Sequence, residues 1–147
     1  MFTKWDILFV TRFPDTILCK TCHRNFSITK HACEYCSTEN HVSSFVAKPR
    51  PAILWIDQTR WRDSMAFAIP LSASRFFDDS HNHIVLKEHC SFTHPDNKYH
   101  VPRRAMIHQS TRIDGNTLRT NNKIGLLDDH VVRTLIENKL LEWLFGS

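Results

Sequence analysis

The sequence predicts a small β-barrel with one helix packed on it, and three observations support this fold class. Short segments rich in strand-forming residues recur along the chain between Pro, Asn and Asp residues. The C-terminal segment changes to a helical period. A cysteine-rich segment at 17–45 has too few apolar residues to form a core of its own. With 147 residues, 41% of them hydrophobic, we expect one domain over 1–147 that carries 17–45 as an insertion.

The strands are expected where β-branched and aromatic residues gather between turn signals. The first covers 5–13 and ends at Pro14, because proline lacks the N–H that a sheet ladder uses. The later predicted strands are 52–57, 64–71, 83–87 and 104–108, and 110–113 continues the last one past a bend. Turns are expected at 58–63 and at 94–97, where the sequence is HPDN.

The helix is expected over 128–145, where apolar residues recur at steps of three and four. Asp128 or Asp129 is placed to cap its first turn, and Gly146 is placed to end it. The apolar residues that define this amphipathic pattern are Val131, Val132, Leu135, Ile136, Leu140, Trp143 and Leu144.

The four cysteines of the insertion form two CxxC pairs, Cys19 with Cys22 and Cys33 with Cys36. Each pair places two thiolates on one side of a tetrahedron, and two such pairs complete it. We therefore expect a structural Zn²⁺ site. Two disulfides and a redox dithiol are the alternatives, and residues 19–23 also fit the haem-attachment pattern CxxCH. Haem attachment requires export and leaves the second CxxC pair unexplained.

The N-terminal residues favour a cytoplasmic protein, in which thiols stay reduced. They carry no basic leader region, and Asp6 and Arg12 interrupt the only early apolar run. No apolar run approaches the roughly 20 residues that span a bilayer, so no membrane partner is expected. The fifth cysteine, Cys90, is interpreted as a buried or idle thiol. The net charge of +4 permits a nucleic-acid partner without requiring one.

Three blocks together resemble the MazF/PemK family of toxin endoribonucleases. The first is WDILFV at 5–10 with Phe13 and Pro14, and the second is KPRPAIL at 48–54 with IPLS at 69–72. The third runs from His108-Gln109 through 113–114, Leu118 and 124–125 to the final helix. The resemblance covers the chain outside the cysteine segment, and it rests on the order and spacing of the blocks.

The resemblance implies an SH3-like barrel, a homodimer, and metal-independent cleavage of single-stranded RNA that leaves a 2′,3′-cyclic phosphate and a 5′-hydroxyl. A cognate antitoxin protein is the further partner that it implies. Arg50 matches the family's phosphate-binding arginine, and its guanidinium suits a charged phosphorane. Ser72 falls where the family has Thr or Ser, whose hydroxyl can donate to a phosphate oxygen. Lys48 and Arg112 are expected to bind the substrate.

Three positions depart from the family pattern. His108 stands where some members have an acidic proton-transfer group, a task that an imidazole can perform. Met106 replaces an arginine found in some members, and Arg103, Arg104 and Arg112 are charges that could substitute for it. Trp5 replaces a common glycine. These changes keep open a non-catalytic binding module on the same barrel, or a zinc-ribbon adaptor with the barrel as its scaffold.

The cysteine segment has three possible roles. It can be a structural staple for a long loop, a contact for a protein partner, or a finger that faces the substrate. The finger hypothesis rests on basic and aromatic residues, which are Lys20, His23, Arg24, Phe26, Lys30, His31 and Tyr35. A catalytic zinc is not expected, because four thiolates leave no open position for water.

Overall fold

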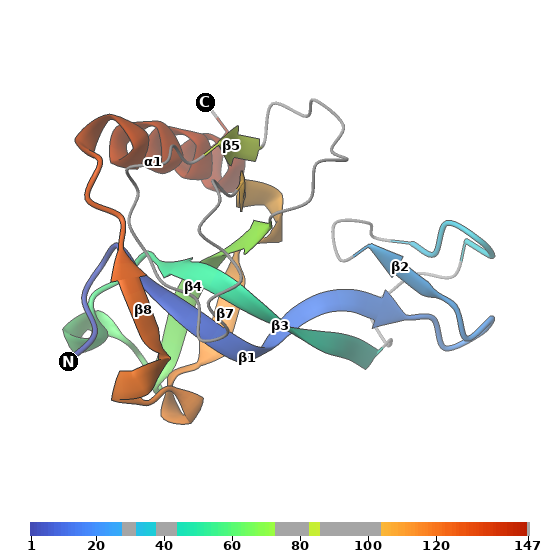
Figure 1. Cartoon of the computed structure of the whole chain (residues 1–147). Coiled ribbons are helices and arrows are strands. Elements are labelled where there is room, and N and C mark those ends of the chain that lie inside the picture. The colour runs from blue at the N-terminus through green and yellow to red at the C-terminus, as the bar shows by residue number, and fades with distance from the viewer. Residues whose placement is uncertain (28–31, 38–43, 73–82, 86–103, 147) are drawn as a thin grey trace. The chain divides into compact units, whose positions relative to one another are not determined.

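The computed structural model describes residues 1–27, 32–37, 44–72, 83–85 and 104–146 (Figure 1). The chain forms two compact units, one of residues 11–49 and the other of residues 1–10 with 50–147. The predicted insertion at 17–45 lies inside the first unit. Cys90, Lys30, His31, Arg103 and the expected turn at 94–97 fall outside the described residues.

The described strands form one mainly antiparallel sheet, so the prediction of a mainly β fold with one helix is confirmed. Their order is β2-β1-β3-β4-β6-β5, with β7 paired to β4 and β8 paired to β1. The strands are β1 (Asp6–Leu18), β2 (Asn25–Ser27), β3 (Ser44–Leu54), β4 (Met65–Ser72), β5 (His83–Val85), β6 (Arg104–Met106), β7 (Thr111–Asp114) and β8 (Lys123–Leu126).

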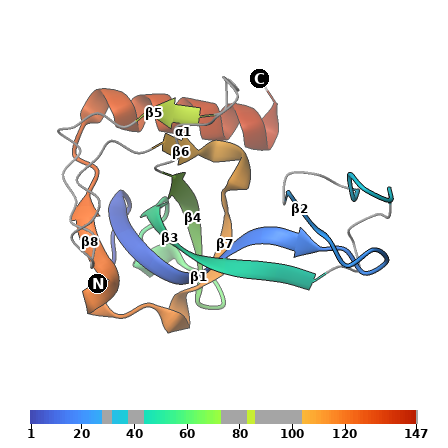
Figure 2. The same ribbon diagram turned by 45° about the vertical axis from the view of Figure 1, so that its right-hand side comes forward.

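Helix α1 (His130–Phe145) lies beside β5 and β6 in both ribbon views (Figures 1 and 2). Between the helix and the sheet lies an apolar core to which three helix residues contribute: Val132, Ile136 and Leu140. The sheet residues of this core include Ile7, Ile53, Ile69, Leu71 and Ile107. In the described part of the chain, no helix is both long and apolar enough to cross a membrane.

Both ends of α1 match the expected caps. The Asp129 carboxylate accepts a hydrogen bond from the Val132 N–H at 3.0 Å, as an N-cap residue does. Gly146 follows the last turn with φ +65°, and its N–H donates to the Glu142 carbonyl. The amphipathic pattern is only partly borne out, because Val131 and Leu135 are 67% and 51% exposed.

Several predicted strand boundaries are wrong. β1 continues through Pro14 to Leu18, and its described pairing with β2 begins at Thr16. β3 begins at Ser44 and ends at Leu54, earlier than predicted at both ends. Residues 107–109 form a 3₁₀ helix, η3 (Ile107–Gln109), where strand had been expected. β2 and β8 were not predicted, since each is too short to show a period.

Asp6 anchors the start of the chain. Its carboxylate is fully buried, lies 3.1 Å from the Lys123 ammonium group, and accepts hydrogen bonds from the Thr3 N–H and hydroxyl. A buried carboxylate needs such partners to offset its lost hydration. The anchor fixes the chain as it enters β1 and positions Trp5, whose backbone has φ +77°.

Candidate functional site

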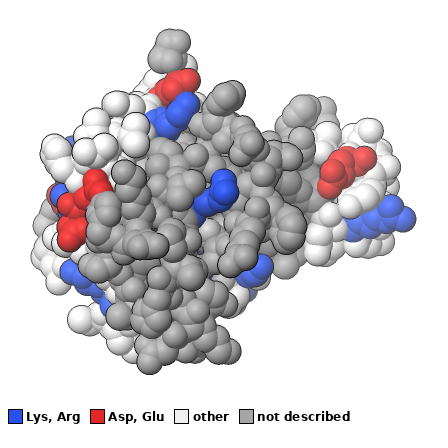
Figure 3. All heavy atoms as spheres, turned by 45° about the horizontal axis from the view of Figure 1, so that its top comes forward, with Lys and Arg blue, Asp and Glu red and all other residues white. Residues whose placement is uncertain are grey.

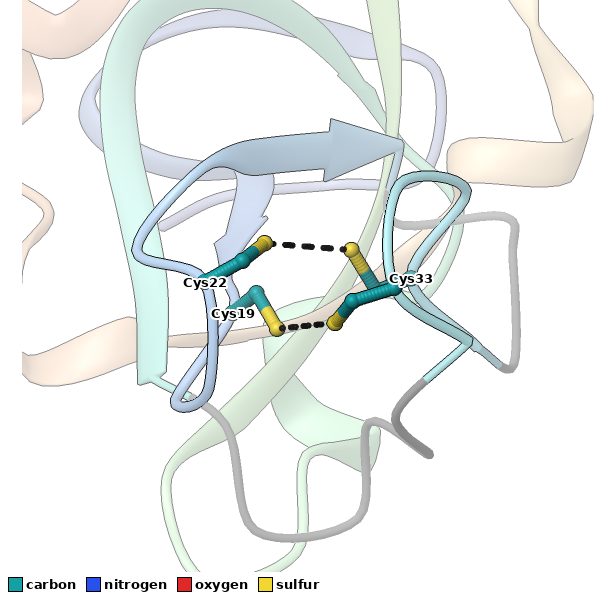
Figure 4. A group of neighbouring side chains, drawn as sticks. Cys19, Cys22 and Cys33 are labelled. Atoms are coloured by element: carbon teal, nitrogen blue, oxygen red, sulfur yellow. Dashed lines mark hydrogen bonds between the residues drawn. The ribbon is translucent and has the colours of Figure 1, made fainter.

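The four cysteine sulfurs form one cluster within the unit of residues 11–49. All four Sγ atoms lie within 4.8 Å of one another (Figure 4). Cys19 faces Cys36 at 3.5 Å between sulfurs, and Cys22 faces Cys33 at 3.6 Å. The structure therefore brings together the four residues that sequence spacing predicts as metal ligands. Each cysteine of the first CxxC pair faces a cysteine of the second pair.

The spacing of these sulfurs suits a tetrahedral metal ion. Four thiolates around Zn²⁺ at about 2.3 Å are separated by roughly 3.8 Å along each edge of the tetrahedron. The two measured separations are close to that edge. They are much longer than a disulfide bond of about 2.05 Å, and all four cysteines are free thiols. The cluster could hold a metal ion.

Each CxxC pair is built by the same backbone turn. The His23 N–H donates to the Cys19 carbonyl at 3.0 Å, and the Ser37 N–H donates to the Cys33 carbonyl at 2.8 Å. His23 and Ser37 each follow a CxxC directly, and their φ angles are +61° and +63°. The left-handed residue turns the chain back and leaves the preceding thiols on one side.

Electrostatics at the cluster favour a bound cation. Backbone hydrogen bonds, chiefly from Cys22, lower the pKa of Cys19. A backbone hydrogen bond from Arg24 lowers the pKa of Cys22, but burial and the three neighbouring thiols outweigh it and raise that pKa to about 11. Neighbouring thiols resist ionising together, and a divalent cation removes this penalty because thiolates are its ligands.

The described surface of the cysteine unit carries basic and aromatic side chains. The Arg24 guanidinium lies 5.0 Å from the centre of the Tyr35 ring, which is 54% exposed. Lys20 and His23 are exposed as well, and Glu34 is an acidic neighbour. These side chains can meet a nucleic acid or an acidic protein segment.

A second candidate site is the end of the sheet formed by β3, β4 and β6. The β3–β4 register runs from Leu54–Ala68 to Ala52–Pro70, and extending it by two residues would set Arg50 opposite Ser72. Ser72 in turn pairs with Arg104 on β6. Directly opposed residues share a sheet face, so Ser72 and Arg104 lie in one cross-strand row, to which the extended β3–β4 register would add Arg50. All three are half-buried.

The sequence alone does not assign Arg104 as a catalytic or substrate-binding residue. It was one of three nearby arginines considered as a substitute for the charge missing at Met106. The β4–β6 register singles it out as the neighbour of Ser72. Only the pairing of strands carries this information, because 31 positions separate the two residues in sequence.

His108 lies on η3, which packs against α1 and β4. Its imidazole stacks on the indole of Trp143, with 5.5 Å between ring centres and an interplanar angle of 27°. Burial in this contact, together with the charge of Lys139, lowers the pKa of His108 below its usual value. The imidazole is therefore mainly neutral at pH 7.

Arg112, one of the two predicted substrate-binding cations, lies apart from this row. Arg112 on β7 pairs with Phe67 on β4, five residues from Ser72, which is roughly 17 Å along the strand. Lys48 is exposed and belongs to the unit of residues 11–49, whereas Arg50 belongs to the other unit. On the face shown in Figure 3, the described Lys and Arg side chains stand as separate groups, with Asp and Glu groups elsewhere on that face. Charge alone does not mark a substrate surface there.

No protein-family model matches this chain, and a search among curated proteins finds no match.

Proposed function

We propose that this protein is a toxin-like endoribonuclease that cleaves single-stranded RNA by attack of the ribose 2′-hydroxyl, with no metal ion in the reaction. The products are a 2′,3′-cyclic phosphate and a 5′-hydroxyl. The observation that carries the proposal is the pairing of Ser72 with Arg104 at one end of the sheet, to which the extended β3–β4 register would add Arg50.

The row offers the groups that this reaction needs at the phosphate. The pentavalent phosphorane gains negative charge, which planar guanidinium groups stabilise through paired hydrogen bonds. Arg50 and Arg104 flank Ser72 on the neighbouring strands, and the Ser72 hydroxyl can donate to a non-bridging oxygen. His108, mainly neutral at pH 7, is in the form that accepts a proton from a 2′-hydroxyl.

The backbone at Trp5 supports the resemblance on which the proposal also rests. This residue takes the place of a common family glycine, and its φ of +77° lies in the left-handed region that glycine adopts without strain. Trp5 therefore has the kind of backbone conformation for which a glycine is suited. An SH3-like barrel over the unit of residues 1–10 and 50–147 is part of the same proposal.

The metal that we propose for the four cysteines is Zn²⁺, in a structural role. Four thiolates suit zinc and leave no open position for a reacting water. Free thiols of this kind persist in a reducing compartment, which agrees with a cytoplasmic protein. The zinc would order residues 11–49, whose described part contains few buried apolar side chains.

One observation favours a non-catalytic module that binds nucleic acid or protein on the same barrel. His108 packs on Trp143 of α1, with 5.5 Å between ring centres. A proton-transfer group held away from the phosphate would leave binding without cleavage.

The deciding experiment is incubation of the purified protein with a long single-stranded RNA in EDTA, with zinc content measured before and after. Defined cuts with cyclic phosphate ends would establish the nuclease. Intact RNA from protein that retains its zinc would contradict it and favour the binding module.

We predict that Arg50→Ala lowers the cleavage rate at least a hundredfold, because one charge-stabilising donor is worth about 2.7–4 kcal/mol in a transition state. The rate of cyclic phosphate formation under single-turnover conditions measures this loss. Arg119→Ala is the matched control, since that arginine is exposed and its guanidinium donates to the nearby Asn116 and Leu118 carbonyls. Equal rates for the two variants would remove Arg50 from the mechanism.

A homodimer and a cognate antitoxin remain part of the proposal. Light scattering of the purified protein measures the first. Co-purification with an acidic protein encoded beside it tests the second.

A further inference from the structure

A pocket of about 570 Å³ opens beyond the end of β3, in the unit of residues 1–10 and 50–147. Its size falls in the range of small-molecule sites, about 300–1,000 Å³. The lining residues used below are Lys4, Trp55, Asp57, Arg60, Trp61 and Arg62. Two indoles and three cations thus share one pocket with one carboxylate.

Trp61 is held rigidly in the wall. Its indole N–H donates to the Ile56 carbonyl at 3.1 Å, and the Phe2 ring stacks against it with 6.2 Å between centres. The backbone of Gly115 lies so close that a Cβ there would meet the ring at 2.5 Å. A ligand therefore meets a preorganised aromatic surface, which lowers the entropy cost of binding.

Trp55 carries a hydrogen-bond donor that the fold does not use. Its ring packs edge-on against Phe67, with 6.0 Å between centres, and the Lys4 ammonium lies 4.9 Å from its centre. Its buried Nε1 has no hydrogen-bond partner among the described residues. A buried indole N–H normally finds an acceptor, so the unused donor is an unusual feature of this residue of the pocket wall.

The charge of the pocket is positive where it is open. Arg60 and Arg62 are exposed, and their side chains have no partner in the described part of the chain. The Asp57 carboxylate is occupied by the Lys4 N–H at 2.7 Å, while the Lys4 ammonium pairs with Glu137 at 3.0 Å. The guanidinium groups of Arg60 and Arg62 are therefore available to bind an anion.

Strand register places a further cation, Arg112, in the same cross-strand row as Trp55. The Trp55 N–H donates to the Phe67 carbonyl, and Phe67 pairs with Arg112 on β7. These three residues form a second cross-strand row, because directly opposed residues share a face. The Arg112 side chain, expected from sequence to bind substrate, lies on this row and not on the row of Ser72.

We propose that this pocket binds a nucleotide, with the base against the indoles and a phosphate at Arg60 and Arg62. A planar π-system joined to an anion is the ligand that two tryptophans and two exposed guanidinium groups select together. The nucleotide is either one unit of a single-stranded RNA or a free mononucleotide.

The pocket is separate from the row of Arg50, Ser72 and Arg104. Arg50 and Trp55 are five residues apart on consecutive extended backbone, roughly 17 Å, and an odd spacing sends their side chains to opposite faces of the sheet. Binding here does not depend on RNA cleavage. The pocket can be tested even if the proposed nuclease activity fails.

The test uses the full zinc-loaded chain and a fluorescein-labelled pentamer of 2′-O-methyl adenylate, which has no 2′-hydroxyl with which to react. Anisotropy gives the affinity, and quenching of tryptophan fluorescence reports contact of a base with an indole. Competition by adenosine 5′-monophosphate distinguishes the two sources. Efficient competition identifies a free nucleotide, and its failure identifies an RNA strand.

The informative variant is Arg60→Ala/Arg62→Ala, which we expect to weaken pentamer binding at least tenfold and to abolish the quenching. Arg12→Ala/Arg119→Ala removes the same charge from exposed side chains outside the pocket and is expected to weaken binding less than twofold. Equal weakening by both double variants, or no binding by the parent protein, would overturn the proposal. Arg60→Lys/Arg62→Lys keeps the charge, and its affinity for the pentamer is expected to lie between those of the two double alanine variants.

Discussion

At the scale of single residues, the contact between His108 and Trp143 controls how the imidazole titrates. Burial and the nearby Lys139 charge lower the pKa of His108 in the folded protein, whereas the unfolded chain keeps the usual value of about 6.5. The unfolded state therefore binds the proton more readily. The stability that the neutral imidazole contributes is complete above pH 6.5 and is lost as the pH falls from there through the folded pKa.

We predict that Lys139→Met raises the pKa of His108 while leaving it below 6.5, because the burial that remains still disfavours the imidazolium ion. An NMR titration of the His108 ring measures both values. Lys139→Arg keeps the charge and is expected to leave the pKa near that of the parent. No change in Lys139→Met would show that burial alone sets the pKa.

Gly115 is a residue whose lack of a side chain is required by its neighbours. A Cβ at this position would lie 2.5 Å from Cζ3 of Trp61 and 2.6 Å from the Ser64 carbonyl oxygen. The Ser64 contact is with backbone, so a side-chain adjustment alone cannot relieve it. The glycine keeps β7 close to the turn that carries Trp61.

We predict that Gly115→Ala lowers the free energy of unfolding by about 1–3 kcal/mol, the usual cost of overpacking. Urea denaturation measures the loss. Adding Trp61→Phe, which shrinks the ring, is expected to recover part of it. If the single variant is as stable as the parent, the turn is more adaptable than the close contact implies.

At the scale of elements, the two CxxC turns share one construction with one strained residue in each. Ser37 and His23 adopt the left-handed conformation without being glycine, at a cost of about 1–2 kcal/mol per residue. A turn that accepts this cost must be held by something that outweighs it. Metal coordination by the four thiolates would supply a much larger energy.

We predict that Ser37→Val weakens zinc binding at least fivefold, because a β-branched residue is poorly tolerated at positive φ. Competition with a chromogenic chelator measures the affinity. Thr21→Val makes a similar swap at an exposed position of the other CxxC turn where φ is not positive, and it is expected to bind zinc as the parent does. Equal affinities for both variants would contradict the role given to the turn.

The comparison between sequence and structure differs among elements for physical reasons. Asp129 and Gly146 could be predicted as helix ends because caps act through local backbone geometry. Which face of the helix is buried could not be predicted, since the exposed Val131 and Leu135 are as apolar as the buried Val132 and Ile136. What decides between them is the sheet face that they meet.

The candidate sites also differ in how far the sequence predicts them, and the difference again depends on whether the information is local. The CxxC spacing is local, so four ligands were predicted from it and the sulfurs meet. The partner of Ser72 is set by strand pairing over a long sequence separation, so Arg104 was not singled out. The Trp55 pocket combines the N-terminus with the β3–β4 turn, and no spacing in the sequence relates them.

At the scale of the whole molecule, two units with different sources of stability share one chain. The unit of residues 1–10 and 50–147 contains the apolar core under α1, whereas residues 11–49 contain the cysteine cluster. Burial of apolar surface is the main driving force of folding in the first unit. In the second, metal binding and folding would be coupled.

We predict that Cys22→Ser/Cys33→Ser loses the metal and the amide protection of residues 11–49 while the core amides of α1 stay protected. Hydrogen exchange with mass spectrometry resolves the two units, and metal analysis confirms the loss. Cys90→Ser is the control and should change neither. Loss of protection in α1 as well would mean that the core depends on the metal-binding unit.

The route of the chain into and out of residues 11–49 has an evolutionary consequence. The chain enters this unit along β1 and leaves along β3, and these two strands are neighbours in the sheet. A segment whose two ends are adjacent can be gained, lost or exchanged without altering the path of the remaining chain. The cysteine unit is therefore a cassette, and protein engineers could replace it with a short hairpin or with another binding module.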